Sequence, residues 1–385
     1  MSLAGLSMKV FTAQTAEAIA DHPVGKVIYM YALATRALHL LAPEDAHVLT
    51  IDLLKAGLGP VSRLDTPELA VSVAFDGGVL NFRNCVGLAA GFDKNAEVPL
   101  AMLRSGFGFV ECGTVTPLPQ DGNPKPRLFR LSEDQAVINR MGFNNKGLDV
   151  FADRMAHNLP HRGDGVIGLN IGANKDASDR MADYVTGLKR LWGQGDYFTV
   201  NISSPNTPGL RALQGKSYLD DLLGQIAETR TALRAASGTN MPVFLKIAPD
   251  LDANEIGDTV EETIKHGLDG LIVSNTTLSR DGLQSALKTE AGGMSGAPLF
   301  ELSTLALRTA YQASSGKLLL IGAGGIDCGQ RAYAKIRAGA SLIQLYSAMV
   351  YHGPALADVI RRDLVARLRA DGFRSVSEAV GADLA

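Results

Sequence analysis

Short apolar runs recur along the chain from Val86, typically ending in glycine, asparagine, serine or threonine before a longer helical pattern begins. Continuous apolar runs are typical of strands buried on both faces, as in a parallel sheet. Eight strand-then-helix units predict an α/β fold, a (β/α)8 TIM barrel; a doubly wound sheet is the alternative, but eight units at this spacing favour closure. The runs are 86–91, 107–115, 166–172, 197–203, 242–249, 270–277, 318–326 and 341–349, with helical patterns such as 217–236 and 253–267 between them.

Two stretches do not fit this repeat. Residues 116–165 are too long for an ordinary loop after a strand, so we expect a functional insertion over the strand ends. Before the first barrel strand, two alternating runs flank Asp76-Gly77-Gly78, which predicts a β-hairpin at the barrel floor.

Residues 1–65 form a separate helical region, and the barrel occupies 66–385. Helices are predicted near 24–41 and 44–58, with Pro43 at the junction. The first helix is basic and rich in apolar residues, and it carries no acid. It is either an ordinary helix packed on the barrel or a helix that lies in a membrane interface.

Composition narrows the function classes. The chain has 37 Lys and Arg residues against 40 Asp and Glu residues, a net charge of −3. A general nucleic-acid binder needs an excess of basic residues to bind phosphates, so the composition argues against that class. The cysteines Cys85, Cys112 and Cys328 have no metal spacing and cannot form a disulfide framework, which fits a reducing compartment. No signal peptide and no uncharged run of 18 apolar residues is evident.

The predicted strand ends indicate the kind of site. They are rich in amides and hydroxyls and carry two lysines, Lys94 and Lys246, but no histidine. No carboxylate pair has metal or glycosidase spacing, so we expect no metal. Buried amides need a polar partner. A flavin and a small heterocyclic acid would fit such a site.

Glycine-rich loops predict a phosphate site after strands seven and eight, where barrels often bind phosphate. GAGGI at 322–326 is followed by YSA at 346–348, and GGMSG at 292–296 could close on the same group. A dinucleotide GxGxxG motif is absent from the βα turns.

Ser204 lies in SSPN after the fourth strand. Such a serine is by default a turn residue or cap. Because it follows a buried strand, it should face the pocket mouth. The serine has neither a following histidine for a triad nor a GxSxG elbow, which argues against a hydrolase. The functional alternative is that Ser204 accepts a proton from a carbon next to a carbonyl.

Taken together, the motifs resemble the dihydroorotate dehydrogenases, specifically the quinone-dependent class 2 enzymes. Serine at 204, where class 1 enzymes carry cysteine, supports the class. The motifs that carry the resemblance are PEDAHVLT, GLAAGFDKN, ECGTVTPLPQDGNPKPRLFRL, INRMGFNNKG, NISSPNTPGLR, FLKIAPD, SNTTLSR, GGMSG, IGAGGI and QLYSAM.

The resemblance implies that dihydroorotate is oxidised to orotate with FMN as cofactor, in pyrimidine biosynthesis. Ser204 would be the catalytic base, taking the C5 proton while C6 gives hydride to the flavin. The implied FMN contacts are Ala90, Gly91, Phe92, Asp93, Lys94, Thr114, Asn170, Asn201, Lys246, Ser274, Gly296, Gly325, Tyr346 and Ser347. The implied substrate contacts are Lys94, Asn139, Arg140, Met141, Gly142, Phe143, Asn201, Asn206, Asn275 and Thr276.

The resemblance also implies that the N-terminal helices form a tunnel for a ubiquinone-type quinone, lined by His47 and Arg130. The expected location is the cytoplasmic side of the cell membrane, as a peripheral monomer. Two rival functions are a flavin barrel that acts on another ring and a non-catalytic phosphate-binding barrel that docks on membranes.

Overall fold

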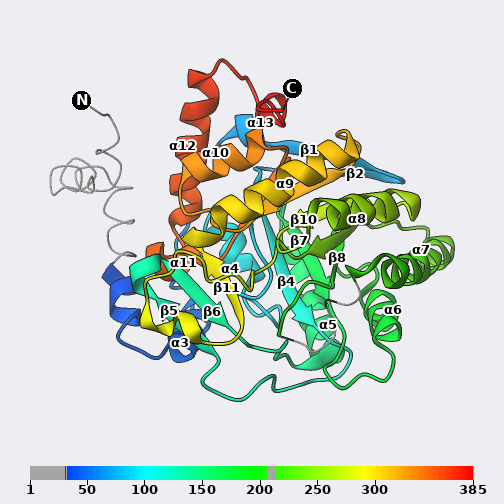
Figure 1. Ribbon diagram of the computed structural model, residues 1–385, viewed down its shortest axis with the longest axis horizontal. Helices are drawn as coiled ribbons and strands as arrows, with labels where there is room; N and C mark the ends of the chain where they lie inside the picture. Colours follow the sequence, from blue (N-terminus) through cyan, green and yellow to red (C-terminus); the bar gives the residue numbers. More distant parts are fainter. Residues whose placement is uncertain (1–30, 32, 207–210, 212–213, 385) are drawn as a thin grey trace.

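The computed structural model describes the chain except for residues 1–30, 32, 207–210, 212–213 and 385. The predicted barrel is confirmed, because eight parallel strands pair in chain order and the last pairs with the first (Figure 1). They are β3 (Val86–Leu88), β4 (Phe109–Val115), β7 (Val166–Ile171), β8 (Tyr197–Asn201), β9 (Val243–Ile247), β10 (Gly270–Val273), β12 (Leu319–Ala323) and β13 (Leu342–Leu345).

Helices cover the outside of the barrel, as the sequence pattern predicts (Figure 1). The two named helical patterns form α7 and α8, and α8 begins with an Asp252–Glu255 capping box. The helices are α4 (Pro99–Arg104), α5 (Gly147–Asn158), α6 (Arg180–Leu191), α7 (Lys216–Ser237), α8 (Ala253–Lys265), α9 (Phe300–Ser314), α10 (Gly329–Arg337), α11 (Ala348–His352), α12 (Leu356–Ala370) and α13 (Val376–Ala379).

Aromatic rings fill part of the barrel interior. Phe109 packs edge-on against Phe82 at 5.2 Å, and Tyr197 packs on Phe244 at the same centroid distance. The ring of Phe109 requires a glycine on the neighbouring strand, because a Cβ on Gly87 would lie 2.2 Å from it. With this part of the barrel packed solid, the open volume lies at the carboxyl ends of the strands.

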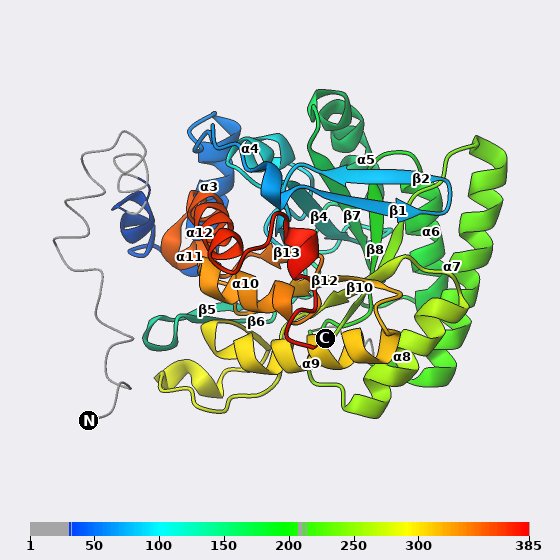
Figure 2. The ribbon, with the colours of Figure 1, turned by 90° about the horizontal axis from the view of Figure 1, so that it is seen from above.

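The predicted hairpin is confirmed as β1 (Val71–Phe75) and β2 (Gly78–Phe82), an antiparallel pair along one side of the molecule (Figure 2). Its turn residue Asp76 contacts Arg234 and Asn240, which precede β9 at the amino end of the barrel. The hairpin therefore lies away from the strand ends that hold the site.

The insertion after β4 forms a second sheet. Its strands β5 (Leu128–Leu131) and β6 (Ala136–Asn139) pair antiparallel, and β11 (Gly293–Gly296) adds to β6. Residues almost 160 positions apart thus share one small sheet over the strand ends, as Figure 1 shows.

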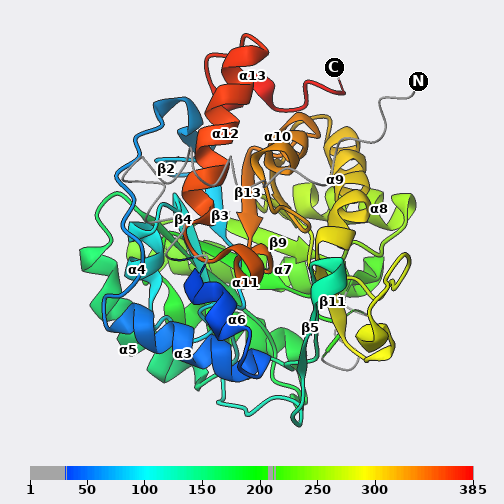
Figure 3. The same cartoon turned by 90° about the vertical axis from the view of Figure 1, so that its left-hand side faces the viewer.

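The second N-terminal helix is α3 (Pro43–Lys55), with Pro43 in its first turn and Gly57 at a φ of +78° after its end. It lies beside β5 (Figure 3). Residues 33–38 of the first predicted helix are helical, whereas 24–30 and 32 lie outside the described residues. None of the helices in the described ranges is long and apolar enough to span a bilayer. The domain boundary after residue 65 stays a prediction.

Candidate functional site

One cavity of about 280 Å³ runs from the carboxyl ends of the barrel strands to the N-terminal helices. The polar side chains predicted at the strand ends line its inner part. Its outer part is lined by Ala46, His47 and Thr50 of α3, by Arg130 and by α11. The cavity therefore joins the predicted site to the predicted tunnel.

The amide cluster at the strand ends is a connected hydrogen-bond network. Asn201 donates through Nδ2 to Thr114 Oγ1 at 2.9 Å, and Asn275 donates to Ser203 Oγ at 2.9 Å. Asn206 donates to Asn139 Oδ1 at 3.2 Å, which joins β8 to the insertion. These bonds fix which amide atoms remain for a ligand.

Glu111 anchors this network from inside the barrel. It is fully buried and accepts hydrogen bonds from Asn170, Gln344, Thr199 and Tyr197 at 2.7–3.1 Å. Because a carboxylate only accepts, Asn170 and Gln344 must turn their NH₂ groups towards it. The carbonyl of Gln344 is then left as a buried acceptor with no hydrogen-bond partner in the described structure.

Two lysines face the cavity. Lys246 at the end of β9 is buried, and burial lowers its pKa although Glu111 opposes the shift. Burial also lowers the pKa of Lys94 to about 8, with Glu44 opposing. Neither ammonium has a hydrogen bond within the described ranges, so both are available to an anionic ligand.

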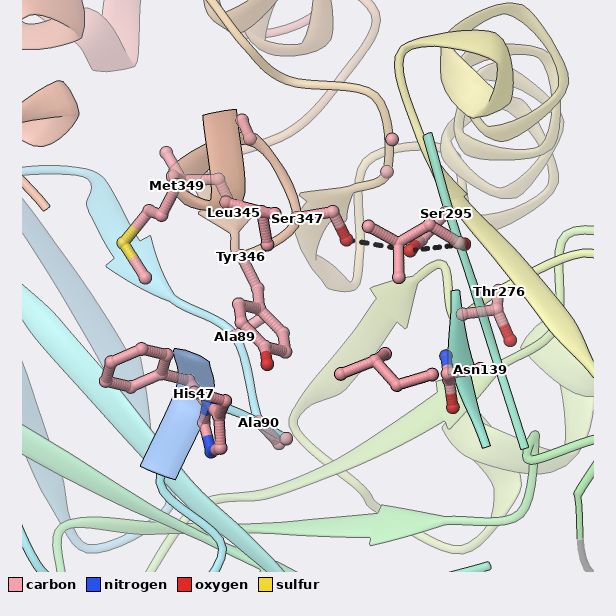
Figure 4. Close-up of a pocket in the computed structure, with 18 of the residues that line it drawn as sticks. His47, Ala89, Ala90, Asn139, Thr276, Ser295, Leu345, Tyr346, Ser347 and Met349 are labelled. Atoms are coloured by element: carbon pink, nitrogen blue, oxygen red, sulfur yellow. Dashed lines mark hydrogen bonds between the residues drawn. The ribbon is translucent and has the colours of Figure 1, made fainter. Parts of the chain in front are cut away.

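The predicted phosphate loops meet at one end of the cavity. Ser347 donates to Ser295 at 2.7 Å (Figure 4), which joins the loop after β13 to β11. Gly296 has a φ of +100° and Gly325 a φ of +75°. A Cβ on Gly325 would lie 2.5 Å from Phe300, so only glycine lets the backbone sit there.

Ser204 is buried and lines the cavity. Its Oγ accepts a hydrogen bond from the backbone N–H of Asn206 at 3.2 Å. That donor favours negative charge on Oγ, as a proton acceptor requires. The Oγ is therefore held against the backbone of its own loop, at the wall of the cavity.

Three predicted site residues do not line the cavity. Asp93 turns away and accepts from the N–H groups of Glu97 and Val98, so it caps the following turn. Asn170 lies behind Thr114, whose hydroxyl it accepts at 2.6 Å. Arg140 points outward to Glu290 at 2.6 Å. Direct ligand contacts of these three residues stay predictions.

The remaining predicted contacts line the cavity as a group. They are Ala90, Gly91, Phe92, Lys94, Thr114, Asn139, Met141, Gly142, Phe143, Asn201, Asn206, Lys246, Ser274, Asn275, Thr276, Gly296, Gly325, Tyr346 and Ser347. In Figure 4, Ala89 and Ala90 lie on one side of the cavity and Asn139 and Thr276 on the other.

The two predicted tunnel residues lie in the outer part of the cavity. The His47 ring packs edge-on against Phe92 at 5.4 Å and lies 6.5 Å from Tyr346 (Figure 4). Burial and the Lys94 charge lower the pKa of His47 to about 3, so its imidazole is neutral near pH 7. Arg130 donates to the carbonyl of Leu41 and thereby joins β5 to the helical region.

Among the residues at or behind the cavity that were not predicted are Glu111, Ser295, Gln344 and His39. Ser295 and Gln344 stand inside motifs that the sequence analysis singled out, so their positions were detectable. His39 contacts the carbonyl of Val350 at 2.6 Å, more than 300 positions along the chain, which no local pattern indicates.

These features define a (β/α)8-barrel enzyme with an amide-lined site. The dihydroorotate dehydrogenase family model matches residues 73–368. The chain is 54% identical to the dihydroorotate dehydrogenase (quinone) of Parvibaculum lavamentivorans, over 92% of this chain and 99% of that protein. It is 53% identical to the Rhizobium johnstonii protein of the same name, over 90% of this chain and 94% of that protein.

Solved structures agree with these sequence relatives. The ligand-free DHODH of Eimeria tenella has a TM-score of 0.85 at 42% identity and covers 89% of this chain and 100% of that chain. The same protein in complex with ferulenol has a TM-score of 0.84, covering 89% and 96%. The chain belongs to the dihydroorotate dehydrogenase family, in its quinone-dependent class 2.

Proposed function

We propose that this chain oxidises dihydroorotate to orotate with FMN at the strand ends and delivers the electrons to a quinone, as a step of pyrimidine biosynthesis. The observation that carries the proposal is the single cavity that joins the amide cluster to the N-terminal helices. One redox group in that cavity could be reached by a polar substrate from one side and by an apolar acceptor from the other.

FMN fits the residues present. Thr276 Oγ1 and Gln344 Oε1 are buried without hydrogen-bond partners in the described structure, and both line the cavity, so a polar planar ligand would satisfy them. Gly296 and Gly325 shape a cradle for the phosphate end, with Ser347 beside it. Thr114, Asn201, Lys246 and Ser274 would hold the ring system. When bound, FMN accepts the electron pair from the substrate and later passes it to the acceptor.

The chain's own residues bind and orient the substrate. Lys94 would pair with its carboxylate, while Asn139, Asn206, Asn275 and Thr276 would hold the ring by hydrogen bonds. Ser204 would accept the C5 proton on Oγ, helped by the N–H of Asn206. Lys246 would supply fixed positive charge where negative charge develops.

The helical region would guide the quinone. Its exposed apolar side chains include Leu40, Val48, Leu49, Leu53 and Leu58, with Leu40 88% exposed. A patch of this kind on helices at the mouth of an apolar passage fits contact with a membrane surface. We propose that residues 1–65 are a membrane-contacting unit on the barrel of residues 66–385, and that the protein is a peripheral monomer on the cytoplasmic face.

A flavin bleaching experiment tests the proposal. The purified protein should be yellow, and anaerobic dihydroorotate should bleach the flavin absorbance, which a quinone analogue should restore. A colourless protein that binds no FMN would contradict the enzyme assignment. Bound flavin that dihydroorotate leaves unbleached would favour a flavin barrel acting on another ring.

A further inference from the structure

Lys335 on α10 is a fully buried lysine that none of the roles above uses. Its ammonium makes one hydrogen bond in the described structure, to Ser303 Oγ at 2.6 Å, and lies 5.4 Å from the centre of the Phe300 ring. None of the carboxylates in the described ranges comes within ion-pair distance of it. A buried ammonium left in this state is costly unless an anion binds nearby.

The ammonium lies directly behind the predicted phosphate loop. Ser303 Oγ, which accepts from Lys335, lies 3.0 Å from the carbonyl of Gly324, and Gly324 lines the cavity. A Cβ on Gly324 would lie 2.9 Å from that same Oγ, and one on Gly325 2.5 Å from Phe300. Lys335 is thus two hydrogen bonds from the cavity wall.

The other charges around Lys335 do not neutralise it. Arg331, on the same helix, places its guanidinium carbon 5.1 Å from the centre of the Phe300 ring and donates a hydrogen bond to Gly325 O at 3.2 Å. Its charge is paired with Asp327 at 2.6 Å. Glu301 on α9 is exposed and acts on Lys335 only at a distance. Burial lowers the pKa of Lys335 well below that of an ordinary lysine, and Glu301 opposes the shift.

We propose that Lys335 is the buried counter-charge for the phosphate of the bound flavin, taking up a proton when that phosphate binds and acting through the Ser303–Gly324 contact. It is a positioning residue, because its ammonium reaches the loop only through Ser303 and does not touch the ligand. The inference rests on the proposed function, since it needs FMN in the cavity. By linkage, phosphate binding and protonation of Lys335 must favour each other to the same extent.

Flavin binding by the full-length, flavin-freed chain provides the test, using FMN and riboflavin between pH 7 and pH 9 with flavin fluorescence as readout. The two ligands share the ring, so effects of Lys94 and Lys246 appear in both. The phosphate stays a dianion here, because its second pKa is about 6. FMN affinity should fall relative to riboflavin as pH rises, by up to about tenfold per pH unit for one coupled proton.

Lys335→Met keeps the side-chain length and removes the charge. The substitution should weaken the affinity for FMN by about tenfold or more and leave the affinity for riboflavin within about twofold. It should also abolish the pH dependence of the ratio of the two affinities. His352 also lines the cavity, and burial lowers its pKa, so His352→Gln is the control that should keep the wild-type pH dependence.

The outcomes separate the two proposals. Failure of the wild-type chain to bind FMN would contradict the proposed function itself. Tight FMN binding with a pH-independent ratio, or a pH dependence that survives in Lys335→Met, would overturn the role of Lys335 alone. If Lys335→Met shows no cooperative melt, the wild-type ratio and the His352→Gln control decide the question.

Discussion

At the scale of single residues, Ser204 is the proposed proton acceptor, and no carboxylate or imidazole is hydrogen-bonded to it in the described structure. Ser204→Ala should keep FMN and orotate binding but slow flavin reduction by about 10²–10⁴-fold, the usual contribution of a general base. Stopped-flow bleaching by dihydroorotate measures this directly. Reduction at close to the wild-type rate would return Ser204 to the role of a turn residue.

Lys94 gives the site a pH dependence. With its pKa lowered to about 8, the ammonium is charged below that pH and neutral above it. Orotate affinity should therefore be flat at lower pH and weaken as pH rises through about 8, because the neutral amine no longer attracts a carboxylate. Titration of the holoenzyme by flavin absorbance checks this. Lys94→Met should bind orotate weakly at every pH; an unchanged profile in that variant would assign the dependence to another group.

Residue identities were largely predictable because parallel strands bring their carboxyl ends together. Thr114, Asn201, Lys246 and Ser274 each close such a strand, so one rule places them all in the cavity. Asp93 follows no such rule. It stands within the same motif as Lys94, yet its side chain caps the backbone at Glu97 and Val98, a local choice that spacing alone does not reveal.

At the scale of elements, the barrel strands and α3 follow from apolar runs and Pro43, whereas the sheet of β5, β6 and β11 does not. Its pairing between 136–139 and 293–296 joins strands of four residues each, too short to carry a distinct pattern. The phosphate site was predicted from the glycines of 292–296 and 322–326, together with residues 346–348 after β13. The Ser295–Ser347 bond within this site depends on that unpredicted pairing.

One ion pair attaches α3 to the insertion before β5. Glu44 accepts from Arg127 Nη2 at 2.7 Å and from Nε at 3.2 Å, and the Arg127 side chain is 8% exposed. Glu44→Gln should lower the free energy of unfolding by about 1–3 kcal/mol, because it leaves Arg127 partly buried without its counter-charge. Thermal unfolding measures the loss, and quinone turnover should fall with it.

The pH dependence and a matched control make this prediction sharper. Burial raises the pKa of Glu44, but the Arg127 hydrogen bond and charge outweigh burial and leave it lowered. A lowered pKa contributes stability above the ordinary glutamate value of about 4.3 that is lost as pH falls below it. The difference in free energy of unfolding between wild type and Glu44→Gln should therefore shrink as pH falls. Lys125, 63% exposed and 3.5 Å from Glu44, is the control, and Lys125→Ala should change stability little. Equal losses of stability in both variants would contradict the role of the Glu44–Arg127 ion pair.

At the scale of the whole molecule, the polar site and the apolar passage belong to different parts of the chain. All residues proposed to contact flavin or substrate lie at or beyond Ala90, whereas Ala46, His47 and Thr50 line the outer cavity. Deleting residues 1–65 should therefore leave a barrel that dihydroorotate still reduces. Turnover with a long-tailed quinone should collapse, because the apolar entrance is gone, while a small soluble acceptor should retain most of its rate.

Vesicle binding should fall in the same truncation. Val48, Leu49 and Leu53 are exposed on α3, and each CH₂ buried in a membrane contributes about 0.8 kcal/mol. The deletion also removes the partners of Arg127 and of Glu97, which pairs with Lys55, so folding must first be confirmed by retained FMN and a cooperative melt. For a folded product, sedimentation with vesicles and turnover with the two acceptors give independent readouts. Full activity with the long-tailed quinone would mean that the helices only pack against the barrel, and the electrons would then have to leave by another face of the cavity.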